Sequence, residues 1–359
     1  MNTPRRSLIA ACACAGVLGL AGAAAAQRAA APAYAVTARL AIGGDGGWDY
    51  LTVAPDGHRL FVSRSTHVQV VDLDRDSVVG DIPNTPGVHG IALVPAVGRG
   101  FTSNGRDSSV TIFDLKTLDV LGRVHIPGRN PDAIAFEPAS GRVFTMNGGS
   151  GSATALDPAT GAVVGTVEFG GKPEAAASDG NGRFYINVED RSEVVAVDPR
   201  RLAVEAHWPL APCEEPTGMA IDRVRHRLFV GCGNRMMAVV DAESGKVVAT
   251  LPIGGGVDGV AFDSAAGLAF SSNGEGTITV VRGGAGDRYA VAQTVPTQLG
   301  ARTIALDPPT HRLFLPAARY GPRPAPTPDM PTRRPPVIPG SFTVLVVASG
   351  GAAHSDHHP

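Results

Sequence analysis

Seven short apolar segments recur along the chain at intervals of 40 to 44 residues, and each opens with a residue that is usually charged. The opening residues are Asp49, His89, Asp132, Glu174, Thr217, Asp258 and Arg302. A period of this length is typical of proteins whose repeats cannot bury their apolar faces alone and must pack against neighbouring repeats. The repeat count therefore constrains the architecture before any single motif does.

Each repeat contains four short apolar runs separated by Gly, Pro, Asp and Asn. In the third repeat the runs and their turns occupy residues 132–138, 141–147, 152–161 and 162–171. This pattern predicts four strands in an antiparallel meander. The 45 Gly, the 29 Pro and the charged content of 18% agree with short strands and tight turns. Seven such units around an axis form an all-β, seven-bladed β-propeller.

The two ends of the repeat region complement each other. The seventh repeat has three predicted strands, and the run at residues 34–42 resembles the missing fourth strand. We therefore expect the N-terminal strand to pair into the last blade and to close a propeller spanning residues 35–349. Residues 320–340 are rich in Pro and predict a long loop inside the last blade. The tail at residues 350–359 is expected to be disordered.

The first 26 residues have the pattern of a secretory signal peptide. Arg5 and Arg6 precede an Ala-rich apolar run, and the arginine pair also has the twin-arginine form, so the export route stays open. We expect a periplasmic or secreted protein. No other segment reaches the roughly 18 apolar residues needed to span a bilayer, so no transmembrane segment is predicted.

Charge argues against a nucleic-acid partner. Removal of the signal lowers Lys plus Arg from 31 to 29 and leaves Asp plus Glu at 33, for a net charge of −4. A general nucleic-acid binder needs a basic surface to neutralise phosphates. We therefore expect no nucleic-acid partner, and a small polar ligand or another protein instead. The expected oligomeric state is a monomer.

The meander places the starts of the innermost strands and the loops between second and third strands on one face of the disc. We call this the mouth face, because the central channel opens there. Polar groups that converge at such an opening form a common type of ligand site. The predicted ligand-binding residues are Asp49, His89, Asn104, Arg106, Asp132, Asn147, Glu174, Asn187, Glu189, Glu215, Asp258, Asn273, Arg302 and Arg319. Alternatively, the carboxylates accept hydrogen bonds from loop N–H groups or face channel water.

The same topology places Cys213 beside Cys232 in the fifth repeat. In an oxidising compartment this pair predicts a disulfide that fixes the corner of one mouth-face loop.

Two kinds of chemistry fit the predicted mouth. Oxygen ligands from Asp132, Glu174, Glu215 and Asp258, with Asn147, Asn187 and Asn273 nearby, suit calcium or magnesium, and His89 would make the site mixed. The histidines of the tail, His354, His357 and His358, are a second place for a transition metal. The sequence leaves the identity of a divalent cation open.

Acid–base catalysis is the second kind of chemistry that fits the predicted mouth. His89 is the histidine predicted at the mouth, where nearby carboxylates would raise its pKa, and Arg302 could hold an anionic substrate. These two candidate catalytic residues would serve a lyase or a lactone hydrolase. Nucleophilic triads and phosphate-binding loops are absent from the sequence.

The strand pairs at residues 58–74, 141–167 and 226–254 resemble the YVTN-type repeat of secreted bacterial β-propellers, including YncE-like proteins. The resemblance covers residues 35–349. It implies an exported seven-bladed propeller, and it transfers no catalytic residue. Our leading hypothesis is a binding or interaction protein that uses its charged mouth face. The enzyme hypothesis uses the same residues.

Overall fold

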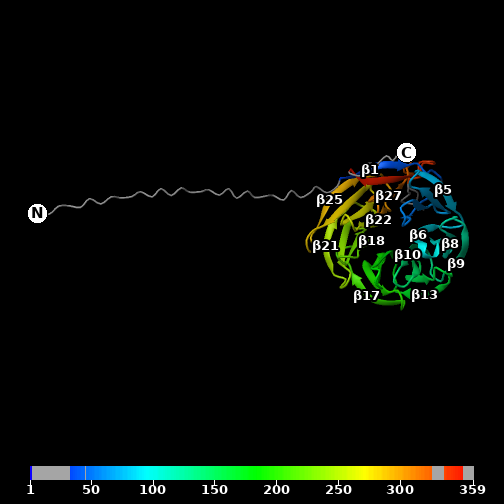
Figure 1. Ribbon diagram of the computed structural model, residues 1–359, viewed down its shortest axis with the longest axis horizontal. Coiled ribbons are helices and arrows are strands. Elements are labelled where there is room, and N and C mark those ends of the chain that lie inside the picture. The colour runs from blue at the N-terminus through cyan, green and yellow to red at the C-terminus, as the bar shows by residue number, and fades with distance from the viewer. Residues whose placement is uncertain (2–32, 45, 326–334, 351–359) are drawn as a thin grey trace. The chain divides into compact units, whose positions relative to one another are not determined.

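A computed structural model gives the structure of the chain, and it describes residues 1, 33–44, 46–325 and 335–350. The described chain from Tyr34 onward forms seven four-stranded antiparallel sheets arranged in a ring (Figure 1). This confirms the predicted seven-bladed β-propeller.

The first four blades follow the chain in order. Blade 1 contains β2 (Leu51–Val53), β3 (Arg59–Ser63), β4 (Val68–Asp72) and β5 (Ser77–Ile82). Blade 2 contains β6 (Val88–Val94), β7 (Arg99–Asn104), β8 (Ser109–Asp114) and β9 (Val120–His125). Blade 3 contains β10 (Pro131–Glu137), β11 (Arg142–Asn147), β12 (Ser152–Leu156) and β13 (Val163–Glu168). Blade 4 contains β14 (Pro173–Ser178), β15 (Phe184–Val188), β16 (Glu193–Asp198) and β17 (Ala203–Pro209).

The last three blades complete the ring. Blade 5 contains β18 (Pro216–Asp222), β19 (Arg227–Cys232), β20 (Met236–Asp241) and β21 (Val247–Pro252). Blade 6 contains β22 (Val257–Asp263), β23 (Leu268–Asn273), β24 (Thr277–Gly283) and β25 (Tyr289–Pro296). Blade 7 contains β26 (Ala305–Asp307), β27 (Arg312–Ala317), β28 (Thr343–Ser349) and the N-terminal strand β1 (Tyr34–Leu40). Two short 3-10 turns, η1 (Pro95–Val97) and η2 (Glu189–Arg191), lie between strands.

Strand β1 closes the ring as predicted. It pairs antiparallel with β28, from Tyr34 opposite Ser349 to Leu40 opposite Val344. In Figure 1 the blue β1 lies against the red strands of blade 7, where the two ends of the colour scale meet. The first and last parts of the chain are therefore locked into one sheet.

Tight turns in several blades use the same side-chain chemistry. In the turn between β12 and β13, the Asp157 carboxylate accepts a hydrogen bond from the N–H of Thr160 at 2.8 Å, and Gly161 takes a φ of 77°. Asp72, Asp114, Asp198 and Asp241 accept equivalent bonds from backbone N–H groups two and three residues later. Asp at the start of a turn and Gly at its end favour this reversal.

The apolar core lies between blades. Seven clusters of buried residues occupy the seven interfaces of the described ring, and each cluster draws side chains from two neighbouring blades. Between blades 1 and 2, for example, Phe61 meets Phe113 with ring centroids 5.9 Å apart. A blade therefore buries its faces only when both neighbours are present.

Hydroxyl groups also join the innermost strands of successive blades. Thr52 donates to the carbonyl of Ile91 at 2.8 Å, and Thr303 of blade 7 donates to the carbonyl of Asp49 at 2.7 Å. These bonds fix the spacing of the residues that open the innermost strands.

The predicted disulfide joins Cys213, in the loop before β18, to Cys232, at the end of β19, with a Cα–Cα distance of 5.7 Å. Of the predicted Pro-rich loop, residues 326–334 lie outside the described residues, as do the signal peptide beyond Met1 and the tail from residue 351. None of the helices in the described part has the length and apolar character needed to cross a membrane.

Candidate functional site

The charged strand-opening residues meet at one end of the central channel. The innermost strands lie side by side in chain order, so residues separated by about 40 positions become neighbours. His89, Asp132, Glu174 and Asp258 are each the second residue of an innermost strand. Asp49 and Arg302 lie in the loops just before the innermost strands β2 and β26.

Charge alternates around most of this ring. Arg302 donates to Asp258 at 2.5 Å on one side and to Asp49 at 3.2 Å on the other. His89 Nδ1 lies 2.7 Å from Asp49 Oδ2 and 3.7 Å from Asp132 Oδ1. Each basic group thus bridges the acidic groups of the two adjacent blades.

The alternation breaks between blades 3 and 4, where two carboxylates, Asp132 and Glu174, are consecutive. Lys172 is the nearby cation, and it lies 2.7 Å from Glu174 while also pairing with Glu189. Burial and the charge of Asp132 raise the pKa of Glu174 to about 8, despite the opposing effect of Lys172. Burial likewise raises the pKa of Asp132 to about 6, although His89 opposes the rise. This edge of the ring has a deficit of positive charge.

Burial and neighbouring charges also shift the pKa values of His89 and Asp258. Burial alone would lower the pKa of His89, but its hydrogen bond with Asp49 and the charge of Asp132 outweigh burial, so the pKa is raised. Burial raises the pKa of Asp258 against the attraction of Arg302. The dense carboxylates therefore favour bound protons or other cations.

A cavity of about 620 Å³ opens over the ring. This volume is in the range of small-molecule sites. Its floor and walls combine the mouth carboxylates with residues of the loops before β22, after β23, before β26 and after β27. The lining residues include Asp49, Tyr50, Asp132, Lys172, Glu174, Asp258, Leu299, Arg302, Tyr320, Arg323 and Pro335.

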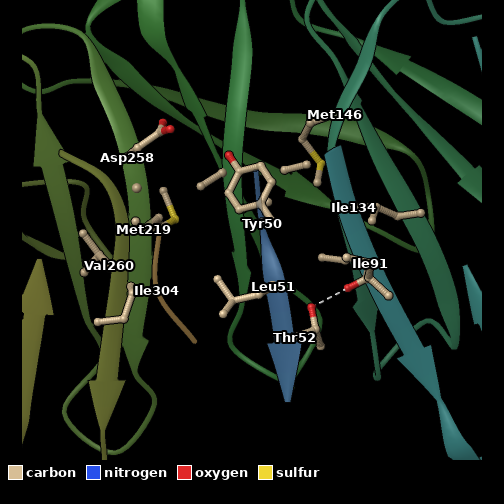
Figure 2. Close-up of a pocket in the computed structure, with 17 residues that line it drawn as sticks. Tyr50, Leu51, Thr52, Ile91, Ile134, Met146, Met219, Asp258, Val260 and Ile304 are labelled. Atoms are coloured by element: carbon tan, nitrogen blue, oxygen red, sulfur yellow. Dashed lines mark hydrogen bonds between the residues drawn. The ribbon is translucent and has the colours of Figure 1, made fainter. Parts of the chain in front are cut away.

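Tyr50 lies where this cavity meets a smaller one along the channel, which we call the shaft. Its side chain comes from blade 1 and packs against the core between blades 3 and 4, so it spans the channel. A second cavity of about 170 Å³ lies along the innermost strands, and Tyr50 and Asp258 line both cavities. Figure 2 shows Tyr50 among the shaft residues, with Asp258 on one side and Met146 on the other. Burial and four nearby carboxylates raise the Tyr50 pKa well above its usual value.

Five of the fourteen predicted ligand residues line the cavity: Asp49, Asp132, Glu174, Asp258 and Arg302. Two more contact these residues or their partners without lining the cavity, since Glu189 pairs with Lys172 and His89 pairs with Asp49. The residues elsewhere are Asn104, Arg106, Asn147, Asn187, Glu215, Asn273 and Arg319. Their ligand roles stay predictions.

Asparagine at the end of a second strand holds its own blade together. Asn147 accepts a hydrogen bond from Thr145 at 2.9 Å and donates to Ser152 at 3.1 Å and Thr154 at 2.9 Å. Asn104 makes the same three contacts in blade 2, and Asn273 makes the two donor contacts in blade 6. Asn187 instead donates to the carbonyls of Thr217 and Gly218.

The other three predicted ligand residues are exposed away from the ring. Arg106 lies in the turn after β7, and Glu215 lies in the loop before β18, where its N–H donates to Ser192. Arg319 follows β27, and its N–H donates to Ser341 at 3.0 Å. The predicted oxygen set that included Glu215 is thus dispersed. Among the residues that the structure describes, the compact set of metal-ligating side chains is Asp49, His89 and Asp132, whose ligand atoms all lie within 4.8 Å of one another.

Sequence reasoning missed Lys172 and Tyr50. A signal for Tyr50 exists, because the residue after the strand opener is Gly, Ala or Thr in the other six repeats and Tyr only in the first. Small residues at this position let neighbouring inner strands approach closely: a Cβ on Gly218 would lie 2.8 Å from the backbone of Gly259. Lys172 lies two residues before a strand opener and has no comparable signal.

Comparisons with known proteins identify the fold. No protein-family model matches the chain, and no curated protein matches it in sequence. Among solved structures, a chain of Kuenenia stuttgartiensis hydrazine synthase is similar with a TM-score of 0.68 and 16% identity, covering 76% of this chain and 94% of that one. The WD40 repeats of RRP9 are similar with a TM-score of 0.71 and 12% identity, covering 89% of this chain and 99% of that one. At this identity the likeness shows the β-propeller fold alone.

Proposed function

We propose that this chain is an exported propeller of the YVTN type whose mouth cavity binds a small polar ligand with an amino group. The observation that carries the proposal is the consecutive pair Asp132 and Glu174, buried where the ring of alternating charges is interrupted. An ammonium group placed there would restore the alternation. Charge-assisted hydrogen bonds to carboxylates would orient it.

The other walls of the cavity suit such a ligand. Tyr50 presents an aromatic ring at the channel axis, and aromatic faces attract ammonium groups. Arg323 lines the outer part, and none of the described residues forms an ion pair with it. An anionic group on the same ligand would find its partner there.

Two features support export. The N-terminal signal pattern predicts it, and the Cys213–Cys232 disulfide is of a kind that persists in oxidising compartments. The repeat pattern adds the resemblance to secreted YVTN-type propellers.

The geometry favours binding over the lyase or lactone-hydrolase hypothesis. His89 turns Nδ1 toward Asp49 and Asp132, whereas Nε2 faces the wall: a Cβ on Gly105 would lie 2.8 Å from it. Arg302 is held by two carboxylates. The catalytic roles of His89 and Arg302 stay predictions.

Calorimetric titration of the mature protein tests the proposal, with EDTA present to remove metals. At pH 9 we expect 1,4-diaminobutane or lysine to bind and 1,4-butanediol to give no heat. Glu174→Gln should weaken amine affinity by about tenfold or more, because a charged hydrogen-bond partner is lost. Affinity should fall as the pH drops below about 8, where Glu174 takes up a proton.

Glu168→Gln is the matched control, because Glu168 is an exposed glutamate on the outer strand β13. It should bind the amines like the wild type. The proposal is overturned if neither amine binds, or if butanediol binds as well as diaminobutane.

A further inference from the structure

Three side chains at the edge of the mouth have the arrangement of an open metal site. His89 Nδ1 lies 2.7 Å from Asp49 Oδ2 and 3.7 Å from Asp132 Oδ1, and the three ligand atoms fall within 4.8 Å of one another. A tetrahedral ion with bonds of about 2.0–2.2 Å keeps its ligands roughly 3.3–3.6 Å apart. Side-chain adjustments of less than about 1.5 Å would complete that geometry.

The half-buried carboxylate of Asp132 has few partners within the described part of the chain. Its side chain is 16% exposed, and its nearest cationic atom is the His89 nitrogen at 3.7 Å. Within the described part of the chain, no hydrogen bond reaches its carboxylate oxygens. A half-buried carboxylate with no protein hydrogen bond and no close counter-ion can accept an external cation without breaking an existing contact.

The net charge of the residues around this site matches that of a divalent cation. Asp49, Asp132 and Asp258 contribute three carboxylates, and Arg302, which pairs with Asp49 and Asp258, contributes one guanidinium. With His89 neutral, as a metal-bound imidazole is, this group carries a net charge of −2. One divalent ion would neutralise it.

Supporting contacts hold the three ligands in place. Arg302 binds Asp49 through Oδ1 and leaves Oδ2 toward His89. The backbone carbonyl of Asp132 accepts a hydrogen bond from Ser103. Such outer contacts orient metal ligands and are part of a working site.

From this geometry we propose that Asp49, His89 and Asp132 bind a divalent transition-metal ion. One imidazole and two carboxylates suit zinc, cobalt or manganese better than calcium. Because Asp132 and Asp49 line the mouth cavity, the unfilled coordination positions face that cavity. The metal site goes beyond the proposed amine site: the two share Asp132, but the amine site also uses Glu174 and the metal site also uses Asp49 and His89.

Titration with cobalt and zinc tests the proposal in the full mature chain. His354, His357 and His358 are replaced by Ser in every sample, so that metal binding by the tail cannot be mistaken for the site. We expect cobalt to produce visible absorption bands of a bound ion and zinc to displace it. His89→Gln and Asp132→Asn should each lower the affinity for zinc about 10- to 100-fold while the thermal melting curve stays cooperative.

His58→Gln is the matched control. His58 Nδ1 lies 2.7 Å from Asp74, the same separation as between His89 and Asp49, but among the described residues this exposed pair is not part of a group of three ligating side chains. Its substitution should leave cobalt and zinc binding unchanged. Wild-type protein that binds neither ion below about 100 μM, or a His89→Gln variant that binds zinc like the wild type, overturns the proposal.

The experiments distinguish failure of the amine proposal from failure of the metal proposal. Glu174→Gln should weaken amine binding and keep the cobalt bands, whereas His89→Gln should lose the bands and keep amine binding in EDTA. A protein that binds zinc but no amine refutes only the amine proposal.

Discussion

At the scale of single residues, the pKa of Glu174 is set by burial and by its neighbours. Burial and the adjacent carboxylate raise its pKa to about 8, far above that of an exposed glutamate. The titratable and charged groups that face it are Asp132, Lys172, Glu189, His89 and Tyr50. The residue type at a strand start does not predict this pKa, because the shift depends on burial and on Asp132 of the neighbouring blade.

This shift makes folding stability depend on pH. Since the folded pKa of Glu174 exceeds its unfolded value, the folded state binds more protons, and stability is lost as pH rises through about 8. We expect the wild-type free energy of unfolding, measured by urea denaturation in EDTA, to fall by on the order of 2–4 kcal/mol between pH 5 and pH 9. Glu174→Gln should remove most of that fall.

The exposed Glu168 again supplies the control, since Glu168→Gln should retain the wild-type pH profile. A Glu174→Gln variant with an unchanged profile would show that other groups cause the pH dependence.

At the scale of elements, the asparagine that ends a second strand ties the second and third strands of its blade. Asn147 is fully buried and makes three side-chain hydrogen bonds across β11 and β12. Its position beside the mouth made it a candidate ligand residue. The structure gives its amide a role inside the blade.

Asn147→Ala should therefore lower stability and leave ligand binding unchanged. We expect a loss of about 1–3 kcal/mol in urea denaturation, because three buried hydroxyl groups lose their partner. Asn181→Ala is the control, since Asn181 is exposed in the turn before β15. A fully stable Asn147→Ala variant with weakened amine affinity would instead support the ligand role.

At the scale of the whole molecule, the ring depends on its closure. Tyr34 on β1 is 3% exposed, and its ring packs edge-on against Phe270 of blade 6 with centroids 5.0 Å apart. The Gln293 side chain bonds to both the N–H and the carbonyl of Tyr34. Strand β1 thus holds blade 7 against blade 6.

Tyr34→Ala should weaken this closure by about 3–5 kcal/mol, the usual cost of removing a buried aromatic side chain. Loss of β1 would also expose the edge of β28, so we expect self-association in light scattering at high protein concentration. Ala38→Ser, at an exposed position of β1, should behave like the wild type in both measurements. A monomeric Tyr34→Ala variant of wild-type stability would contradict this account.

Much of the fold was predictable because it is periodic. The spacing of the strand openers, the Asp and Gly turn signals and the three-stranded seventh repeat predicted the blade number, the meander and the closure by β1. The Cys213–Cys232 pair followed from the same topology. Each of these inferences uses contacts between sequence neighbours or between equivalent positions of the repeat.

The candidate site was predictable only in part. The repeat pattern is enough to predict that mostly charged residues ring one end of a channel, because every repeat places its opener there. How these residues pair, the addition of Lys172 and Tyr50, and the lack of a cation between Asp132 and Glu174 among the described residues emerge from the folded ring. Pairing, burial and pKa depend on distances across the channel, and no repeat encodes those distances alone.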